Sequence, residues 1–217
     1  MDLVVTTSPI VQQGFIDKAI ESVKHIPFLK KFIVCDGLPQ TANALINQKY
    51  SIYKEKVKRD YPDFTIIESP DHRWFIGGIR DFLNKSEAKW IFCIQHDVTA
   101  PQGCDPHSVL ETKPDDAKIL FYNHKPMVRP NHWFPLVEDC VALPFKKTFG
   151  WSERIFLFDK DHMKGILEKY NHKKFIERIA YNQTLHRNSD LEEYWKIWRC
   201  YAIKDEYHTH LVGKTLR

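Results

Sequence analysis

Short apolar runs alternate with helix-forming stretches along the first hundred residues, and this alternation limits the fold more than any other feature. The apolar runs cover residues 3–7, 31–37, 64–68 and 89–94. Each is a few residues long and closes on polar or turn-forming residues, as buried strands do. Strands joined by helices form parallel sheets, because a parallel connection needs a crossover of a dozen or more residues. We therefore predict an α/β fold with a central mixed, mostly parallel sheet flanked by helices.

The segments between these runs have helical signatures. Apolar residues recur at helical spacing over residues 15–23, and a more polar helix is predicted over 44–57. A third helix is predicted over 79–86, directly after the pair Gly77-Gly78. Helices at these places would cover both faces of the sheet.

The second half of the chain has a different texture, with closely spaced prolines between residues 101 and 144. Proline removes a backbone donor and fixes φ, so this spacing predicts a loop-rich half made of short pieces. Within it we expect a strand over 118–122, helices over 161–170 and 190–200, and an alternating strand over 207–210.

Length, charge and cysteine usage exclude several classes of protein. A chain of 217 residues supports one domain with a full core. Its net charge is +4, but the basic residues are interspersed with acidic ones, so a nucleic-acid partner is not predicted. No apolar run approaches the roughly 18 residues that a membrane span needs. The five cysteines lie far apart without a Cys-x-x-Cys pair, which indicates a reducing compartment, and we expect a cytoplasmic location.

Polar residues follow each of the four predicted strands. The carboxyl ends of parallel strands meet at one edge of a sheet, and ligands bind there in open α/β folds. Thr6 and Ser8 would hold a nucleobase, while Asp36 would accept from a ribose hydroxyl or a base imine. Taken singly, each of these residues is more often part of a turn or a helix cap, so the prediction depends on their occurring together. The strand ends carry Thr6-Thr7-Ser8, Asp36, Glu68-Ser69 and Gln95-His96-Asp97.

Phosphate-binding loops of the two common kinds are missing from the sequence. There is no G-x-G-x-x-G after the first strand and no G-x-x-x-x-G-K-[ST] anywhere. A diphosphate would then need a hard divalent cation, Mn²⁺ or Mg²⁺, held by a carboxylate and by the phosphate oxygens. Asp97, just after a buried strand, is the predicted carboxylate.

The stretch Asn84-Lys85-Ser86-Glu87-Ala88-Lys89-Trp90-Ile91-Phe92-Cys93-Ile94-Gln95-His96-Asp97 resembles the segment of GT-A glycosyltransferases that ends in Asp-x-Asp. The resemblance covers residues 1–100. It implies a GT-A, Rossmann-like sheet and transfer of a hexosyl group from a UDP-sugar to a hydroxyl of a glycan or glycoprotein acceptor. Residues 1–100 would be the nucleotide-sugar half and 101–217 the acceptor half of a single domain.

The whole chain also resembles the glycosyltransferase domains that glycosylate chlorella-virus capsids. That resemblance implies a role in viral capsid glycosylation in the host cytoplasm. The chain runs to Arg217 without a clear stop signal for the fold, so we also expect further domains in a longer polypeptide.

The resemblance assigns the metal-binding motif residue by residue. The last metal-binding Asp of the family falls on Asp97, whereas the first falls on Gln95, a neutral and poorer ligand. Gln95 or His96 would then contact ribose or sugar. A literal Asp-x-Asp occurs at 159–161, but it opens a predicted helix, and we interpret it as a helix cap.

The resemblance also suggests residues in the second half. Asp190 matches the carboxylate that deprotonates the acceptor hydroxyl in inverting members, and Asp139 is a second candidate for catalysis. His208 and His210 match C-terminal histidines that reach the metal or diphosphate. Arg80 would pair with phosphate or donate to Asp97.

Two other functions stay open. A sugar nucleotidyltransferase also begins with strand, helix and strand, but it needs a Gly-rich basic loop that the segment after Thr7 lacks. A carbohydrate-binding domain without activity would also tolerate the substitution of the first metal ligand by Gln95.

Overall fold

The computed structural model describes residues 1–8, 14–123, 136–139, 145–148, 154–170, 196–207 and 209–210. Within these ranges the backbone alone is described for residues 74, 123, 136–139, 146–148, 204–207 and 209–210.

A nine-stranded sheet with the order β3-β2-β1-β4-β9-β6-β10-β8-β7 forms the centre of the molecule. Its first four strands are mutually parallel, which confirms the prediction for the first hundred residues. All six residues of β1 are buried, as in a strand covered on both faces. The four strands are β1 (Asp2–Thr7), β2 (Lys31–Cys35), β3 (Thr65–Glu68) and β4 (Trp90–Gln95).

The other five strands make the sheet mixed. Strand β9 lies between β4 and β6 and runs antiparallel to both, while β10 is parallel to β6. A separate two-stranded ribbon pairs β5 (Val98–Thr99) with β11 (Thr209–His210). The five strands of the large sheet are β6 (Ile119–Asn123), β7 (Leu136–Asp139), β8 (Phe145–Thr148), β9 (Ile155–Asp159) and β10 (Cys200–Tyr207).

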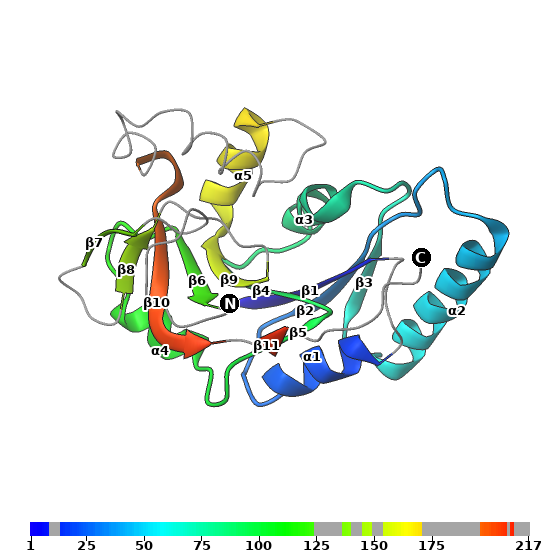
Figure 1. Cartoon of the computed structure of the whole chain (residues 1–217), viewed down its shortest axis with the longest axis horizontal. Coiled ribbons are helices and arrows are strands. Elements are labelled where there is room, and N and C mark those ends of the chain that lie inside the picture. The colour runs from blue at the N-terminus through cyan, green and yellow to red at the C-terminus, as the bar shows by residue number, and fades with distance from the viewer. Residues whose placement is uncertain are drawn as a thin grey trace.

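Helices cover both faces of this sheet, with α3 and α5 on one side and α1 and α4 on the other (Figure 1). Asn43, Asp105 and Asp159 cap α2, α4 and α5 by accepting from backbone N–H groups of the first turn. The Asp-x-Asp at 159–161 therefore opens a helix, as predicted. The helices are α1 (Phe15–Val23), α2 (Ala44–Asp60), α3 (Trp74–Leu83), α4 (Pro106–Thr112) and α5 (Lys160–Lys169).

Two predicted boundaries were wrong. Helix α3 begins at Trp74, so Gly77 and Gly78 lie inside it and do not precede it. A Cβ on Gly78 would come within 2.8 Å of Val34 Cγ1, so this glycine permits close packing of α3 on β2. The helix predicted to reach residue 200 ends earlier, because Arg199 adopts a positive φ of 50° and Cys200 begins β10.

The buried core contains four of the cysteines, Cys35, Cys93, Cys104 and Cys200, which lie among apolar side chains. In the described part of the chain, no helix is both long and apolar enough to cross a membrane.

Candidate functional site

A pocket opens at the carboxyl ends of the four parallel strands. Six of the residues predicted from the sequence line it together: Thr6, Ser8, Asp36, Gln95, His96 and Asp97. Because the strand order is β3-β2-β1-β4, Asp36 and Asp97 lie on opposite sides of the β1 end. Two inter-strand spacings separate β2 from β4, which corresponds to about 10 Å. The remaining lining residues are Thr7, Val34, His72, Phe75 and Gly78.

Asp36, at the β2 end, is held by several donors. Its Oδ1 accepts from the backbone N–H of Gly37 and of Arg73, both at 2.9 Å. Its Oδ2 lies 2.6 Å from Nδ1 of His72. The side chains of Asp36 and His72 are 9% and 12% exposed, so this pair is nearly buried. Asp36 thereby ties the loop after β3 to the end of β2.

Gly37 makes this contact between the end of β2 and the loop after β3 possible. A Cβ at this position would come within 2.1 Å of the backbone carbonyl carbon of Asp71. Only glycine therefore lets the turn after β2 lie against the loop after β3. The Asp-Gly pair that looked like a turn signal in the sequence also brings His72 to the pocket.

His72, Phe75 and Gly78 were missed from the sequence. They lie in the loop after β3 and in the first turns of α3, beyond the polar residues at the strand end itself. The sequence analysis considered only the carboxyl ends of the strands, where ligands bind in open α/β folds. It would have found these three residues if it had also considered the loop and the helix that follow β3. Phe75 is half-buried and its ring lies 5.8 Å from that of Phe156.

Helix α2 supports the pocket through two stacked tyrosines, whose rings lie 5.9 Å apart. Tyr53 forms a buried 2.8 Å hydrogen bond with Thr7, and Tyr50 donates to the backbone carbonyl of Asp36 at 2.6 Å. Burial raises the pKa of both phenols well above the usual range, so both stay protonated. These contacts fix the ends of β1 and β2.

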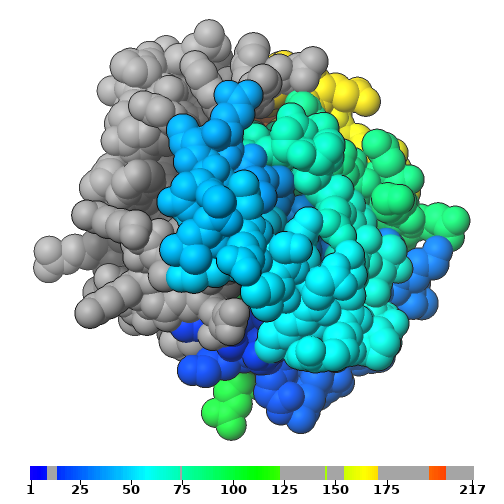
Figure 2. Space-filling view, turned by 90° about the vertical axis from the view of Figure 1, so that its right-hand side faces the viewer, coloured from blue at the N-terminus to red at the C-terminus, as the bar shows by residue number. Residues whose placement is uncertain are grey.

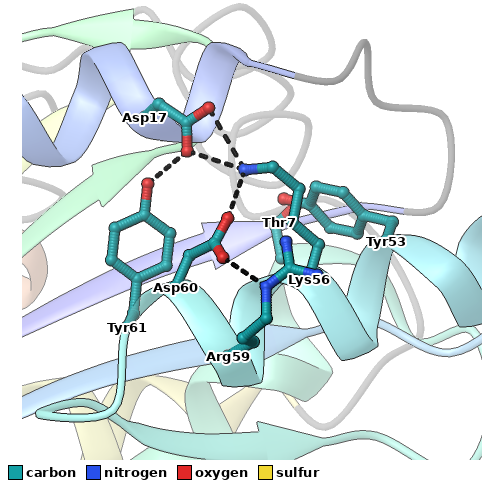
Figure 3. A network of polar contacts seen from close by, with 7 residues as sticks. All are labelled: Thr7, Asp17, Tyr53, Lys56, Arg59, Asp60 and Tyr61. Carbon is teal, nitrogen blue, oxygen red and sulfur yellow. Dashed lines mark hydrogen bonds and ion pairs between the residues drawn. The ribbon is translucent and has the colours of Figure 1, made fainter.

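A network of hydrogen bonds and ion pairs connects α2 to α1 close to Tyr53 (Figure 3). Lys56 contacts Asp17 at 3.1 Å and Asp60 at 3.0 Å, and Tyr61 also donates to Asp17. Burial alone would lower the pKa of Lys56, but its hydrogen bonds to Asp60 and Asp17 raise it overall. The ammonium is therefore charged at neutral pH, and α2 is anchored at its C-terminal half.

Helix α2 and its neighbours in the chain form part of the molecular surface on this side (Figure 2). Figure 2 shows the loop after β2 and helix α2, in light blue to cyan, beside the segment that includes β3 and α3, in cyan to turquoise. The contacts from α2 and α1 that support the pocket all lie within residues 1–100.

The β4 end differs from the β2 end. The backbone N–H and Nδ1 of His96 lie 2.9 Å and 3.2 Å from the carbonyl of Thr6, while the N–H of Gln95 donates to the carbonyl of Arg154 at 3.0 Å. Because a carbonyl only accepts, Nδ1 of His96 carries the proton. Gln95, His96 and Asp97 are each half-buried in the pocket wall.

These residues fit part of a divalent-cation site. Asp97 offers a carboxylate, Gln95 an amide oxygen and His96 an imidazole, which are donors that Mn²⁺ accepts. Over the described residues, no group of three or more His, Cys, Asp or Glu side chains gathers to hold a metal ion. The register of the small ribbon pairs His210 with Val98, the residue after Asp97. The donor set therefore suits a cation that also takes ligands from a bound diphosphate.

Of the other predicted site residues, Arg80 alone is described with its side chain, and it does not line this pocket. Arg80 donates from Nη2 to the backbone carbonyl of Leu167 at 2.6 Å and lines a separate groove between α3 and α5. Asp139 and His210 are described by their backbone alone, in β7 and β11. Asp190 and His208 lie outside the described residues.

Comparison with known proteins finds similarity in structure and not in sequence. No family model and no curated protein matches the chain. TarS 1–349 from S. aureus, solved with UDP-GlcNAc, has a TM-score of 0.55 at 11% identity over 99% of this chain and 60% of that chain. The mannosyltransferase PcManGT from Pyrobaculum calidifontis, solved with GDP-Man and Mn²⁺, has 0.58 at 10% identity over 98% and 57%.

A third solved structure, HddC from Yersinia pseudotuberculosis complexed with GMP-PN, has a TM-score of 0.55 at 14% identity over 97% of this chain and 93% of that chain. The chain thus spans about three fifths of the TarS and PcManGT chains. At these identities the likeness concerns the fold. The mixed, mostly parallel sheet flanked by helices is the GT-A fold, as predicted.

Proposed function

We propose that this chain is a metal-dependent glycosyltransferase that moves a hexosyl group from a UDP-sugar to a hydroxyl of a glycan acceptor. The observation that carries the proposal is the pocket at the strand ends of a GT-A sheet, with the Asp36–His72 pair on one side and Asp97 on the other. The two sides of the pocket therefore suit different parts of a ligand. A sugar nucleotide has two such parts, the base and the diphosphate. Glycosyltransferases of this fold, among them TarS and PcManGT, have been solved with UDP-GlcNAc and GDP-Man.

The diphosphate would lie toward Asp97. A divalent cation bound there would offset the negative charge that grows on the leaving diphosphate. Asp97 would hold that cation, and His208 and His210 are proposed as further ligands. The pairing of His210 with Val98 supports this, because paired residues of an antiparallel ribbon lie about 5 Å apart. Gln95 and His96 would orient the ribose or the donor sugar.

The nucleoside would lie toward Thr6, Ser8 and the β2 end. Phe75 is a half-buried aromatic ring in the pocket wall, suited to stacking against a base. Asp190 and Asp139 remain the proposed bases for the acceptor hydroxyl. Arg80 would reach phosphate only after releasing the carbonyl of Leu167.

The narrower parts of the proposal rest on the sequence resemblance. They are a glycoprotein acceptor in a viral capsid and activity in the host cytoplasm. Neither of them is needed for the chemistry at the strand ends.

Calorimetry with UDP and UTP, each with Mn²⁺, tests the proposed class of reaction. A transferase should bind UDP at least as tightly as UTP and should release UDP from a UDP-sugar supplied with acceptor. Clear preference for UTP, with turnover of a sugar phosphate, would indicate a nucleotidyltransferase. Binding of glycans without binding of either nucleotide would indicate a carbohydrate-binding domain.

A further inference from the structure

The carboxylate of Asp36 is already engaged by the protein. One oxygen accepts from two backbone N–H groups and the other faces the His72 ring at 2.6 Å. A nucleobase that donated to Asp36 would have to compete with these nearly buried contacts. Competition of that kind leaves a buried donor unsatisfied, which disfavours binding. Asp36 is therefore better suited to hold another group than to bind the ligand.

His72 is the group that Asp36 holds, and its ring also lines the pocket. Nδ1 of His72 faces two acceptors, Oδ2 of Asp36 at 2.6 Å and the carbonyl of Gly37 at 3.2 Å. Neither can donate, so the proton of a neutral ring lies on Nδ1. In that tautomer Nε2 is a hydrogen-bond acceptor.

The position of His72 matches the base end of the proposed ligand. It belongs to the loop after β3, on the far side of β2 from the β4 end where Asp97 lies. Phe75 lies three residues further on, at the start of α3, and lines the same pocket. An acceptor nitrogen and an aromatic ring are thus present on one side of the pocket.

We propose that His72 reads the edge of the nucleobase and that Asp36 is a positioning residue, which fixes the tautomer of His72. This inference rests on the proposed function. Nε2 as an acceptor matches the N3–H donor of uracil and opposes the N3 acceptor of cytosine. Uracil and cytosine have the same size, so the tautomer of one ring would decide between UDP and CDP.

Two substitutions separate this assignment from direct recognition by Asp36. His72→Ala should weaken UDP binding about tenfold, as expected for one lost hydrogen bond, and bring the UDP and CDP affinities close together. In Asp36→Asn the amide oxygen would keep accepting from Gly37 and Arg73, so the NH₂ group would face His72. The ring would then carry its proton on Nε2, and the preference should reverse in favour of CDP.

Calorimetry with UDP and with CDP, both with Mn²⁺, gives the affinity ratios, and ¹⁵N NMR of the His72 ring gives its tautomer. His107→Ala is the matched control, because His107 also bonds a backbone carbonyl, that of Pro27 at 2.8 Å, but lies outside the pocket. The control should keep the wild-type ratio. A His72 ring protonated only on Nδ1 in the wild type and only on Nε2 in Asp36→Asn supports the proposal.

The inference is overturned by an unchanged ratio of UDP to CDP affinity in His72→Ala, or by a doubly protonated His72 ring in the UDP complex. Each result would leave UDP binding, and hence the proposed function, intact. Wild-type protein that fails to bind UDP with Mn²⁺ would instead overturn the proposed function and this inference together.

Discussion

Asp36 lies directly after the last residue of β2, and Asp97 lies two residues after the last residue of β4, yet the two carboxylates have different surroundings. Asp36 is nearly buried and faces two backbone N–H groups and His72. Asp97 is half-buried, in a turn at the other side of the pocket. A carboxylate at a strand end can therefore hold neighbouring protein groups in place, or it can face the ligand. Which role it has depends on the loop that closes over it.

Replacement of Asp97 should have the largest effect on activity. In Asp97→Ala the cation loses its protein carboxylate, so turnover should fall by about 10²–10³-fold, the usual range when charge stabilisation is removed from a transition state. Stability should change by less than about 1 kcal/mol, because the position is half-buried. Steady-state kinetics with UDP-sugar and Mn²⁺, together with urea unfolding, measure both quantities. Wild-type turnover in this variant would refute the role of Asp97.

Replacement of Asp36 should affect stability most. Asp36→Ala leaves the N–H groups of Gly37 and Arg73 without their acceptor and removes one of the two acceptors of the His72 ring, which should lower the unfolding free energy by about 2–4 kcal/mol. Asp36→Asn, which keeps one acceptor oxygen, should lose less. Urea unfolding of the two variants is the measurement. A loss below about 0.5 kcal/mol in Asp36→Ala would mean that both carboxylates face the ligand.

Removal of one hydroxyl tests the support from α2. Tyr53→Phe deletes the hydrogen bond to Thr7 and should cost about 1 kcal/mol of stability while raising KM for UDP-sugar about threefold. Tyr61→Phe is the matched control, since the partner of Tyr61 is Asp17, which does not line the pocket, whereas the partner of Tyr53 is Thr7, which does. It should lower stability and leave KM unchanged. Equal KM values in both variants would mean that α2 does not position the end of β1.

The pH dependence of the unfolding free energy tests how well the end of β2 is shielded from solvent. Burial, with a smaller contribution from Glu68, raises the pKa of Cys35 from 9.0 to about 12. Below pH 9 the thiol is protonated in both the folded and the unfolded chain. Between pH 9 and 12 the unfolded chain alone loses this proton, so the unfolding free energy falls as pH rises, by at most about 1.4 kcal/mol per pH unit from this thiol.

The contribution of Cys35 is the difference between the pH curves of wild type and Cys35→Ala. Alanine removes the titrating group, so the slope above pH 9 should be shallower in the variant. Parallel curves would show that the β2 end is open to solvent and resembles the β4 end more closely than we describe.

The sequence predicted the first half of the fold well because its signals are local. The four parallel strands and the grouping of Thr6, Ser8, Asp36 and Gln95-His96-Asp97 follow from short apolar runs and the polar residues after them. His72 was missed because its place in the pocket depends on a hydrogen bond to Asp36, thirty-six positions earlier.

The pairing of strands that lie far apart in the sequence could not be predicted either. Nothing local in 155–159 indicates that β9 inserts between β4 and β6, and nothing in 209–210 indicates pairing with β5. The start of α3 was misplaced because a glycine pair usually ends a helix or precedes one. Here Gly78 instead allows the helix to approach Val34.

The dependence of UDP binding on Mn²⁺ tests the central claim most directly. Calorimetry of the wild type, Asp97→Ala and Asp161→Ala compares the carboxylate at the β4 end with an exposed one from the helix-capping Asp-x-Asp. We predict that Mn²⁺ tightens UDP binding at least tenfold in the wild type and in Asp161→Ala, and not in Asp97→Ala. Equal tightening in all three proteins would contradict the account.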